Sequence, residues 1–206
     1  MELFRPKTQN TSLFVALLVV LTALTTAATI IIAIPFPTST GFLNFGDALV
    51  MLSGLLLGPL GGFFAGGVGS AMGDIALGYI HFAPITFVVK GCEGMIVGFA
   101  SRKAGMVNRL TKTDIAGLVA ASLVMMLGYF TAEIFLFLFL GSSFLVSLGI
   151  AFAELITLNW IQVTAGSIIA ALAGPVIRGF LRDYIYEAES ADSLTEEDIR
   201  PSAEIV

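Results

Sequence analysis

Charged and amide side chains interrupt the apolar stretches of this sequence at a few widely separated places. A charge at the centre of a bilayer costs at least about 2.5 to 3.5 kcal/mol on insertion scales, so such residues mark functional sites by default. Their chemistry is ion pairing and hydrogen bonding, with one another or with a polar ligand. The residues concerned are Asp74, Lys90, Glu93, Glu133, Glu154 and Asn159. We therefore expect a polar pocket at membrane depth.

The composition of the chain supports a membrane location for these residues. Of the 206 residues, 57% are apolar and only 12% are charged, and the mean hydropathy is +0.96. These values exceed those of soluble domains, so we expect an all-α, polytopic membrane protein. The chain has no basic patch that would indicate nucleic-acid binding.

Six transmembrane helices are predicted from stretches of about 20 residues that are mostly apolar. Their ranges are 13–34, 43–58, 60–79, 82–101, 114–140 and 147–176. The run from Gly58 to Gly62 (Gly-Pro-Leu-Gly-Gly) separates the second helix from the third, and the stretch before it is barely long enough to cross a bilayer. A re-entrant hairpin over 43–79 is therefore the alternative.

Lysine and arginine predict the orientation, because short loops rich in these residues stay in the cytoplasm. They occur before the first helix, between the fourth and fifth, and after the sixth, at Arg5, Lys7, Arg102, Lys103, Arg109, Lys112, Arg178 and Arg182. The loops 35–42, 79–82 and 141–146 contain neither residue. Both termini are therefore predicted to lie inside, which requires an even number of spans.

Two regions differ in charge. Residues 1–186 form the single predicted transmembrane domain, whereas residues 187–206 carry seven acids and one arginine. An acidic end of this kind is typical of a solvated cytoplasmic tail with little order, although the residues from Ser193 to Glu196 could cap a short helix.

The intramembrane polar residues share a predicted depth. With the rise of about 1.5 Å per residue of an α-helix, all of them fall in the outer half of the bilayer or near its midplane. A pocket open to the outside would produce this asymmetry, whereas a continuous pore would also place charges in the inner half.

Several predicted pocket residues also have a simpler interpretation. Lys90 and Glu93 are three residues apart on one helix face, so they can form an internal ion pair instead of binding a ligand. One lysine cannot neutralise four carboxylates, and the others need protons, hydroxyl partners such as that of Tyr79, or a ligand. His81 lies at the predicted outer mouth, where an interfacial role is the alternative.

Asn159 and Trp160 offer an amide and an indole, which suit a flat heteroaromatic ring. For Trp160, packing against lipid or the protein core is the alternative. Small residues indicate close helix contacts: glycines 62, 66, 69 and 73 have the spacing of internal packing positions. On the first helix, Ala23 and Ala27 belong to a stripe that fits either packing or docking of another subunit.

One region of the sequence resembles a known family. The resemblance is carried by Gly46-Asp47-Ala48, Gly58-Pro59-Leu60-Gly61-Gly62, Gly69-Ser70, Asp74, Gly78-Tyr79, Pro84, Lys90-Gly91-x-Glu93-Gly94 and Gly98. These residues are similar to those of the substrate-binding S components of energy-coupling factor (ECF) transporters, in the riboflavin and hydroxymethylpyrimidine branch. By length, number of spans and orientation the resemblance covers the whole chain, and its specific part is residues 46–98.

The resemblance implies a subunit that captures a B-vitamin or vitamin precursor from outside and works with a transmembrane scaffold (T) subunit and two ATPase (A) subunits in the cell membrane. It implies scaffold contacts at an Ala-x-x-x-Ala motif, which Ala23 and Ala27 match, and a ligand site near the outer face. The chain has no Walker A sequence, so ATP-driven transport would need partner subunits.

Two other functions can be considered from the residues. A stand-alone proton-coupled carrier would use Glu133 or Glu154 for the proton, although no inverted repeat is visible. An intramembrane enzyme is not expected, because the chain lacks a His-Glu-x-x-His motif and has a single histidine. Neither a metal nor a cofactor is predicted.

The charge balance bears on the ligand. Five outer-half acids, counting Asp47, against one lysine favour a cationic or neutral heterocycle over an anionic vitamin. Hydroxymethylpyrimidine, thiamine, pyridoxine-like compounds and riboflavin all remain open, and protonation of Glu133 and Glu154 would remove the preference.

Overall fold

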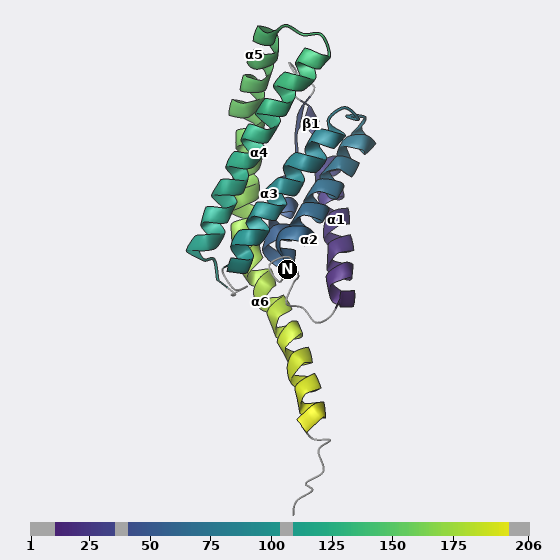
Figure 1. Cartoon of the computed structure of the whole chain (residues 1–206), viewed down its shortest axis with the longest axis vertical. Coiled ribbons are helices and arrows are strands. Elements are labelled where there is room, and N and C mark those ends of the chain that lie inside the picture. The colour runs from purple at the N-terminus through teal and green to yellow at the C-terminus, as the bar shows by residue number, and fades with distance from the viewer. Residues whose placement is uncertain (1–10, 36–40, 104–108, 198–206) are drawn as a thin grey trace, which may run out of the picture.

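The computed structural model describes residues 11–35, 41–103 and 109–197, and side chains as far as residue 181. The chain is almost entirely helical (Figure 1). The elements are α1 (Thr11–Ile31), β1 (Ile34–Pro35), β2 (Phe42–Leu43), α2 (Gly46–Leu77), α3 (Ala83–Lys103), α4 (Lys112–Phe139), α5 (Phe144–Glu154), a π-helical segment (Leu155–Asn159) and α6 (Trp160–Glu197).

Within the described residues, five helical stretches are long and apolar enough to cross a membrane. They are α1, α2, α3, α4 and the continuous stretch Phe144–Leu181, which joins α5 to α6. The predicted all-α membrane fold is confirmed by this arrangement. The two helices predicted over 43–58 and 60–79 correspond to the two halves of the 32-residue element α2, which meet at Gly58.

α2 reverses direction at Gly58, where the backbone has φ 76° and ψ −167°. Only glycine adopts this conformation without strain, and Pro59 follows it at the start of the second half. The two halves then lie side by side: a Cβ on Gly62 would be 2.7 Å from the Cα of Gly54, and one on Gly66 would be 2.7 Å from Cγ1 of Val50. The predicted break at Gly58 is thus confirmed.

Glycines also bring α2 against α3. A Cβ on Gly94 would lie 2.3 Å from the carbonyl oxygen of Gly62, and one on Gly98 would lie 2.3 Å from the carbonyl carbon of Gly58. Backbone meets backbone at both places. The packing role predicted for the glycines of 62–73 is confirmed as well, because Gly69 and Gly73 pack against Thr25 and Thr29 of α1 in the same way.

Replacing Gly94 with alanine is expected to destabilise the protein by about 1 to 3 kcal/mol, because the methyl group cannot be accommodated without separating α2 from α3. The matched control is Gly149→Ala in α5, since a Cβ there would meet nothing within 4 Å. Alanine at an open helical position is neutral or slightly stabilising. Thermal unfolding of both detergent-purified variants measures the difference, and equal midpoints would contradict this contact.

The segments that connect the helices lie at two opposite ends of the bundle (Figure 1). The β1–β2 hairpin, the α2–α3 turn and the α4–α5 turn share one end, which we call the hairpin end. The hairpin was not predicted, because two-residue strands carry no detectable periodicity; it pairs Ile34 with Leu43 and Pro35 with Phe42. The last residues of α3 and the first of α4 lie at the opposite end.

A buried ion pair ties α4 to α6 at this opposite end. Arg178 Nη2 lies 3.0 Å from Oδ1 of Asp114, and both side chains are fully buried. Asp114 also closes a capping box at the start of α4, because its Oδ2 accepts from the backbone N–H of Thr111 and its own N–H donates to Oγ1 of Thr111. This double use fixes where α4 begins relative to α6.

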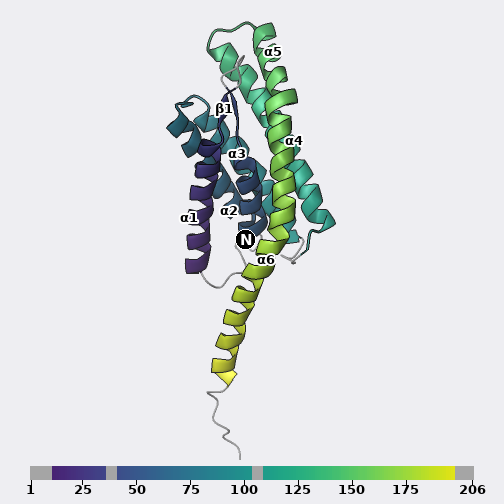
Figure 2. The ribbon, with the colours of Figure 1, turned by 180° about the vertical axis from the view of Figure 1, so that it is seen from behind.

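The predicted end of the last helix near residue 176 was wrong. α6 continues to Glu197 and extends past the other helices (Figure 2). Falling hydropathy marks the end of the apolar stretch, but the residues that follow include helix formers, so the helix does not end there. Part of the predicted acidic tail, residues 187–197, is therefore helical, and residues 198–206 lie outside the described residues.

Candidate substrate-binding site

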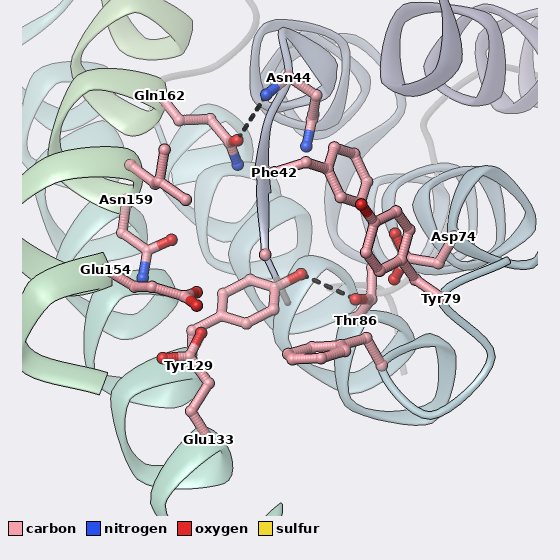
Figure 3. Close-up of a pocket in the computed structure, with 13 residues that line it drawn as sticks. Phe42, Asn44, Asp74, Tyr79, Thr86, Tyr129, Glu133, Glu154, Asn159 and Gln162 are labelled. Carbon is pink, nitrogen blue, oxygen red and sulfur yellow. Dashed lines mark hydrogen bonds between the residues drawn. The ribbon is translucent and has the colours of Figure 1, made fainter. Parts of the chain in front are cut away.

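A pocket lies toward the hairpin end and contains about 420 Å³ of unfilled space, including its open mouth (Figure 3). It is bounded by side chains from the hairpin and from α2, α3, α4, the π-helical segment and its flanking helices. The lining residues are Gly41, Phe42, Asn44, Asp74, Tyr79, Phe82, Thr86, Tyr129, Glu133, Glu154, Leu158, Asn159 and Gln162. Segments from across the chain thus converge on one polar cavity with aromatic walls.

Some of the predicted site residues line this pocket and others do not. Those that do are Asp74, Tyr79, Glu133, Glu154 and Asn159. Lys90 and Glu93 are buried in a separate cluster, and His81 is exposed outside the pocket. Trp160 follows Asn159 directly, but one step along a helix turns a side chain by about 100°, and its indole is 57% exposed.

The carboxyl groups of Glu133 and Glu154 lie next to each other in the pocket wall. The two carboxyl groups lie within hydrogen-bonding reach, and the side chains point toward one another (Figure 3). Both residues are buried, and Oε2 of Glu133 and Oε1 of Glu154 have no hydrogen-bond partner among the described residues. Two ionised carboxylates in this position repel each other, so the pair requires a shared proton or a positively charged partner.

A π-helical turn is what places Glu154 and Asn159 on the same wall. In a regular α-helix, residues five apart are about 140° apart around the axis and cannot face one cavity together. The widened turn Leu155–Asn159 absorbs part of this rotation, so both side chains line the pocket. Segments of this kind are rare and frequently occur at functional sites.

The opposite wall carries a chain of hydroxyl groups that ends on Asp74. The Tyr129 hydroxyl donates to Oγ1 of Thr86 at 2.9 Å, and the Thr86 side chain hydrogen bonds to the carboxylate of Asp74. Oδ2 of Asp74 has no hydrogen-bond partner among the described residues. This wall therefore also presents an acceptor to the pocket.

Aromatic rings form the mouth. The ring centroids of Phe42 in β2 and Tyr79 after α2 are 4.7 Å apart, with a 33° angle between the planes. Gly41, beside Phe42, lies so close to Glu154 that a Cβ there would be 2.5 Å from Oε2 of that residue. The hairpin thus rests directly on the acidic side of the pocket.

Lys90 lies behind the pocket in a fully buried ion cluster. Its Nζ contacts Oδ1 of Asp47 and lies 3.3 Å from Oε2 of Glu93, so the internal ion pair offered by the sequence is present and has a third member. Gln162 connects this cluster to the pocket: its Nε2 donates to both oxygens of Asp47 at 3.3 and 3.2 Å, and its Oε1 accepts from the N–H of Asn44 at 2.9 Å.

Several lining residues were not among the predicted ones. Phe82 and Thr86 precede Lys90 at four-residue spacing, so all three follow one face of α3, and this row was a usable signal. Phe42 and Asn44 lie in and after a hairpin that leaves no such pattern. The predicted docking residues Ala23 and Ala27 lie on α1, the first exposed and the second half-buried.

Comparison with known proteins defines the family. Residues 9–178 match the profile of the family described as "ECF-type riboflavin transporter, S component". The chain belongs to this family. As an ECF S component it is a multi-pass membrane protein of a transporter family, and not a member of an enzyme family.

Two individual proteins are similar to this S component. A protein of Pyrococcus woesei, described as "Uncharacterized protein in gap 3'region", is 47% identical over 104 residues, which cover 50% of this chain and 67% of that protein. A crystal structure of the S component for biotin from an ECF-type ABC transporter shares the fold, with a TM-score of 0.53 and 20% identity over 85% of this chain and 95% of that one.

Proposed function

We propose that this S component captures a heterocyclic B-vitamin or vitamin precursor from the extracellular side for ATP-driven uptake. The observation that carries the proposal is the Figure 3 pocket, in which buried acceptor groups meet aromatic rings at the end of the bundle whose connections lack lysine and arginine. Flat rings with N–H or O–H groups suit such a pocket, because ring faces stack and edges hydrogen bond. The family description makes riboflavin the first compound to test.

The proposed ligand contacts follow the geometry. Asp74, Tyr79, Glu133, Glu154 and Asn159 contact the ligand directly, together with other lining residues. Lys90 and Glu93 support the pocket from behind, through Gln162. His81 and Trp160 have no place in this proposal.

The proposed arrangement in the cell membrane has six crossings, with the two halves of α2 counted separately and both termini in the cytoplasm. The positions of lysine and arginine support this orientation. Energy would come from two ATPase (A) subunits acting through a transmembrane scaffold (T) subunit, which would contact α1 near Ala23 and Ala27. Residues 187–206 would extend into the cytoplasm.

Native mass spectrometry of the full chain, purified in detergent from cells grown in rich medium, tests the capture role. A bound vitamin or precursor of defined mass is the expected result. A folded, empty protein that also fails to bind any B-vitamin or precursor in a thermal-shift panel would refute the proposal.

One observation favours a second candidate. The facing carboxyl groups of Glu133 and Glu154 suit a proton site, so the chain alone could act as a proton-coupled carrier. Liposome uptake separates the two: transport by the isolated chain under a pH gradient supports the carrier, whereas uptake that needs ATP and the partner subunits supports the ECF transporter.

A further inference from the structure

We infer that Glu133 and Glu154 together bind a positively charged nitrogen group of the ligand, such as an amine or amidinium carried on a flat ring. This inference rests on the proposed capture function and names the chemical class of its substrate. It differs from binding of an uncharged ring, for which hydroxyl and amide groups would suffice.

The charge of the pocket wall supports this inference first. Three carboxyl groups line the cavity, from Asp74, Glu133 and Glu154, and no lysine, arginine or histidine is among its lining residues. Lys90, in the cluster behind the wall, is already paired with Asp47 and Glu93. Among the described lining residues no positive group offsets these carboxylates, and the Lys90 ammonium is separated from the cavity by the ring of Tyr129, whose centroid is 5.6 Å from Nζ.

Buried acceptor atoms without partners support it second. Within the described residues, Oδ2 of Asp74, Oε2 of Glu133 and Oε1 of Glu154 accept no hydrogen bond, although the three side chains are at most 4% exposed. Leaving such groups unpaired is costly, and a cationic N–H donor between the two glutamates would satisfy both.

The surroundings favour an organic cation over a metal ion. Among the described residues, no group of three or more His, Cys, Asp or Glu side chains is placed to hold a metal. Instead, the rings of Phe42, Tyr79 and Phe82 line the cavity, together with that of Tyr129, which already has the Lys90 ammonium over it. Faces of aromatic rings attract organic cations, and the attraction grows when water is excluded.

Binding of three probes to the full chain in detergent tests the inference by calorimetry. Thiamine carries an aminopyrimidine, which becomes an amidinium with N–H donors when its ring nitrogen takes up a proton, whereas riboflavin is uncharged and biotin is an anion. We expect thiamine to bind at least about 10-fold more tightly than the other two, the ratio that one charge-assisted hydrogen bond supplies.

Variants that replace a glutamate by glutamine, which has the same shape but no charge, test whether Glu133 and Glu154 are the residues that bind the cationic group. Glu133→Gln and Glu154→Gln are expected to weaken thiamine binding by about 10- to 100-fold and to change riboflavin binding less than about 3-fold. Trp160→Phe, on the exposed side of α6, is the control and should bind thiamine as the wild type does. Thermal unfolding confirms that each variant is folded.

The outcomes separate this inference from the proposed function. Tighter binding of riboflavin or biotin than of thiamine by the wild-type chain, or a co-purified ligand without a basic nitrogen, overturns the charge assignment and leaves vitamin capture standing. That result needs no variant, so misfolding cannot obscure it. Failure of the folded chain to bind any vitamin or precursor refutes the capture function, and the inference falls with it.

Discussion

Replacing Lys90 with methionine is expected to destabilise the protein by about 3 to 5 kcal/mol, because removal of one partner leaves buried charges uncompensated. Lys90 is 2% exposed and is the cation that contacts both Asp47 and Glu93 in the described structure. Methionine keeps the unbranched apolar stem of the side chain but leaves the buried carboxylates of Asp47 and Glu93 without their cation. Equilibrium unfolding in mixed micelles measures the change.

The control variant removes the two buried negative charges as well as the lysine, so that no unpaired charge is left. Combining Lys90→Met with Asp47→Asn and Glu93→Gln is expected to recover most of the lost stability, since neutral replacements of a buried ion cluster are often tolerated. The amide oxygen introduced by Asp47→Asn would still accept from Gln162, so vitamin binding by the triple variant should remain close to that of the wild type. A triple variant as unstable as Lys90→Met would show that lost packing, and not charge, dominates.

Deletion of Ile156 is expected to weaken ligand binding by about 100-fold or more while the chain still folds. Removing one residue from the π-helical segment should restore regular α-helical hydrogen bonding. It should also rotate α5, which precedes the segment, by about 100° relative to α6. α6 is held on α2, where Gly166 packs on Asp47 and Gly174 on Leu55, so the shorter α5 must turn. Glu154 would then leave the pocket, and a charge-assisted contact of about 1.5 to 3 kcal/mol would be lost together with the pairing to Glu133.

The matched control is Ile156→Ala, which keeps the residue count and changes only a side chain that is 57% exposed. It should bind ligand as the wild type does. Circular dichroism and gel filtration report whether the deletion variant is folded, and calorimetry with the ligand identified by mass spectrometry reports affinity. Wild-type affinity in a folded deletion variant would show that the segment does not set the position of Glu154.

The sequence predicts where the apolar helices lie, because each must be long enough to cross a bilayer, and it predicts the Gly58 break because glycine and proline act locally. It does not predict the end of α6, which continues beyond its apolar part. It also marks five pocket residues, because three acids and one amide are conspicuous in apolar surroundings and Tyr79 offers a hydroxyl partner to such acids. Which of these side chains meet depends on helix rotation, and hydropathy does not encode rotation. Lys90 and Glu154 therefore look alike in the sequence, yet one lies behind the pocket and the other in it.

Two further features escaped prediction for different physical reasons. Asp47 contributes to the predicted charge balance and to the family resemblance, but its contacts with Lys90 and Gln162 are not predicted, because these partners are distant in sequence and are brought to it by tertiary packing. The π-helical segment has no composition of its own: Leu155 to Asn159 are compatible with an α-helix, so nothing in these residues predicts a widened turn.

The continuous α6 also has a mechanical consequence. It runs from the edge of the pocket to Glu197, a length of about 57 Å at 1.5 Å per residue. Arg178 lies about 28 Å before the far end of this helix, so a tilt of about 5° around the Asp114 and Arg178 pair would move that end by about 2.5 Å. The Asp114 and Arg178 pair lies along this arm and would act as its pivot, so a small adjustment around the ligand becomes a displacement at the opposite end of the molecule, large enough for another protein to register.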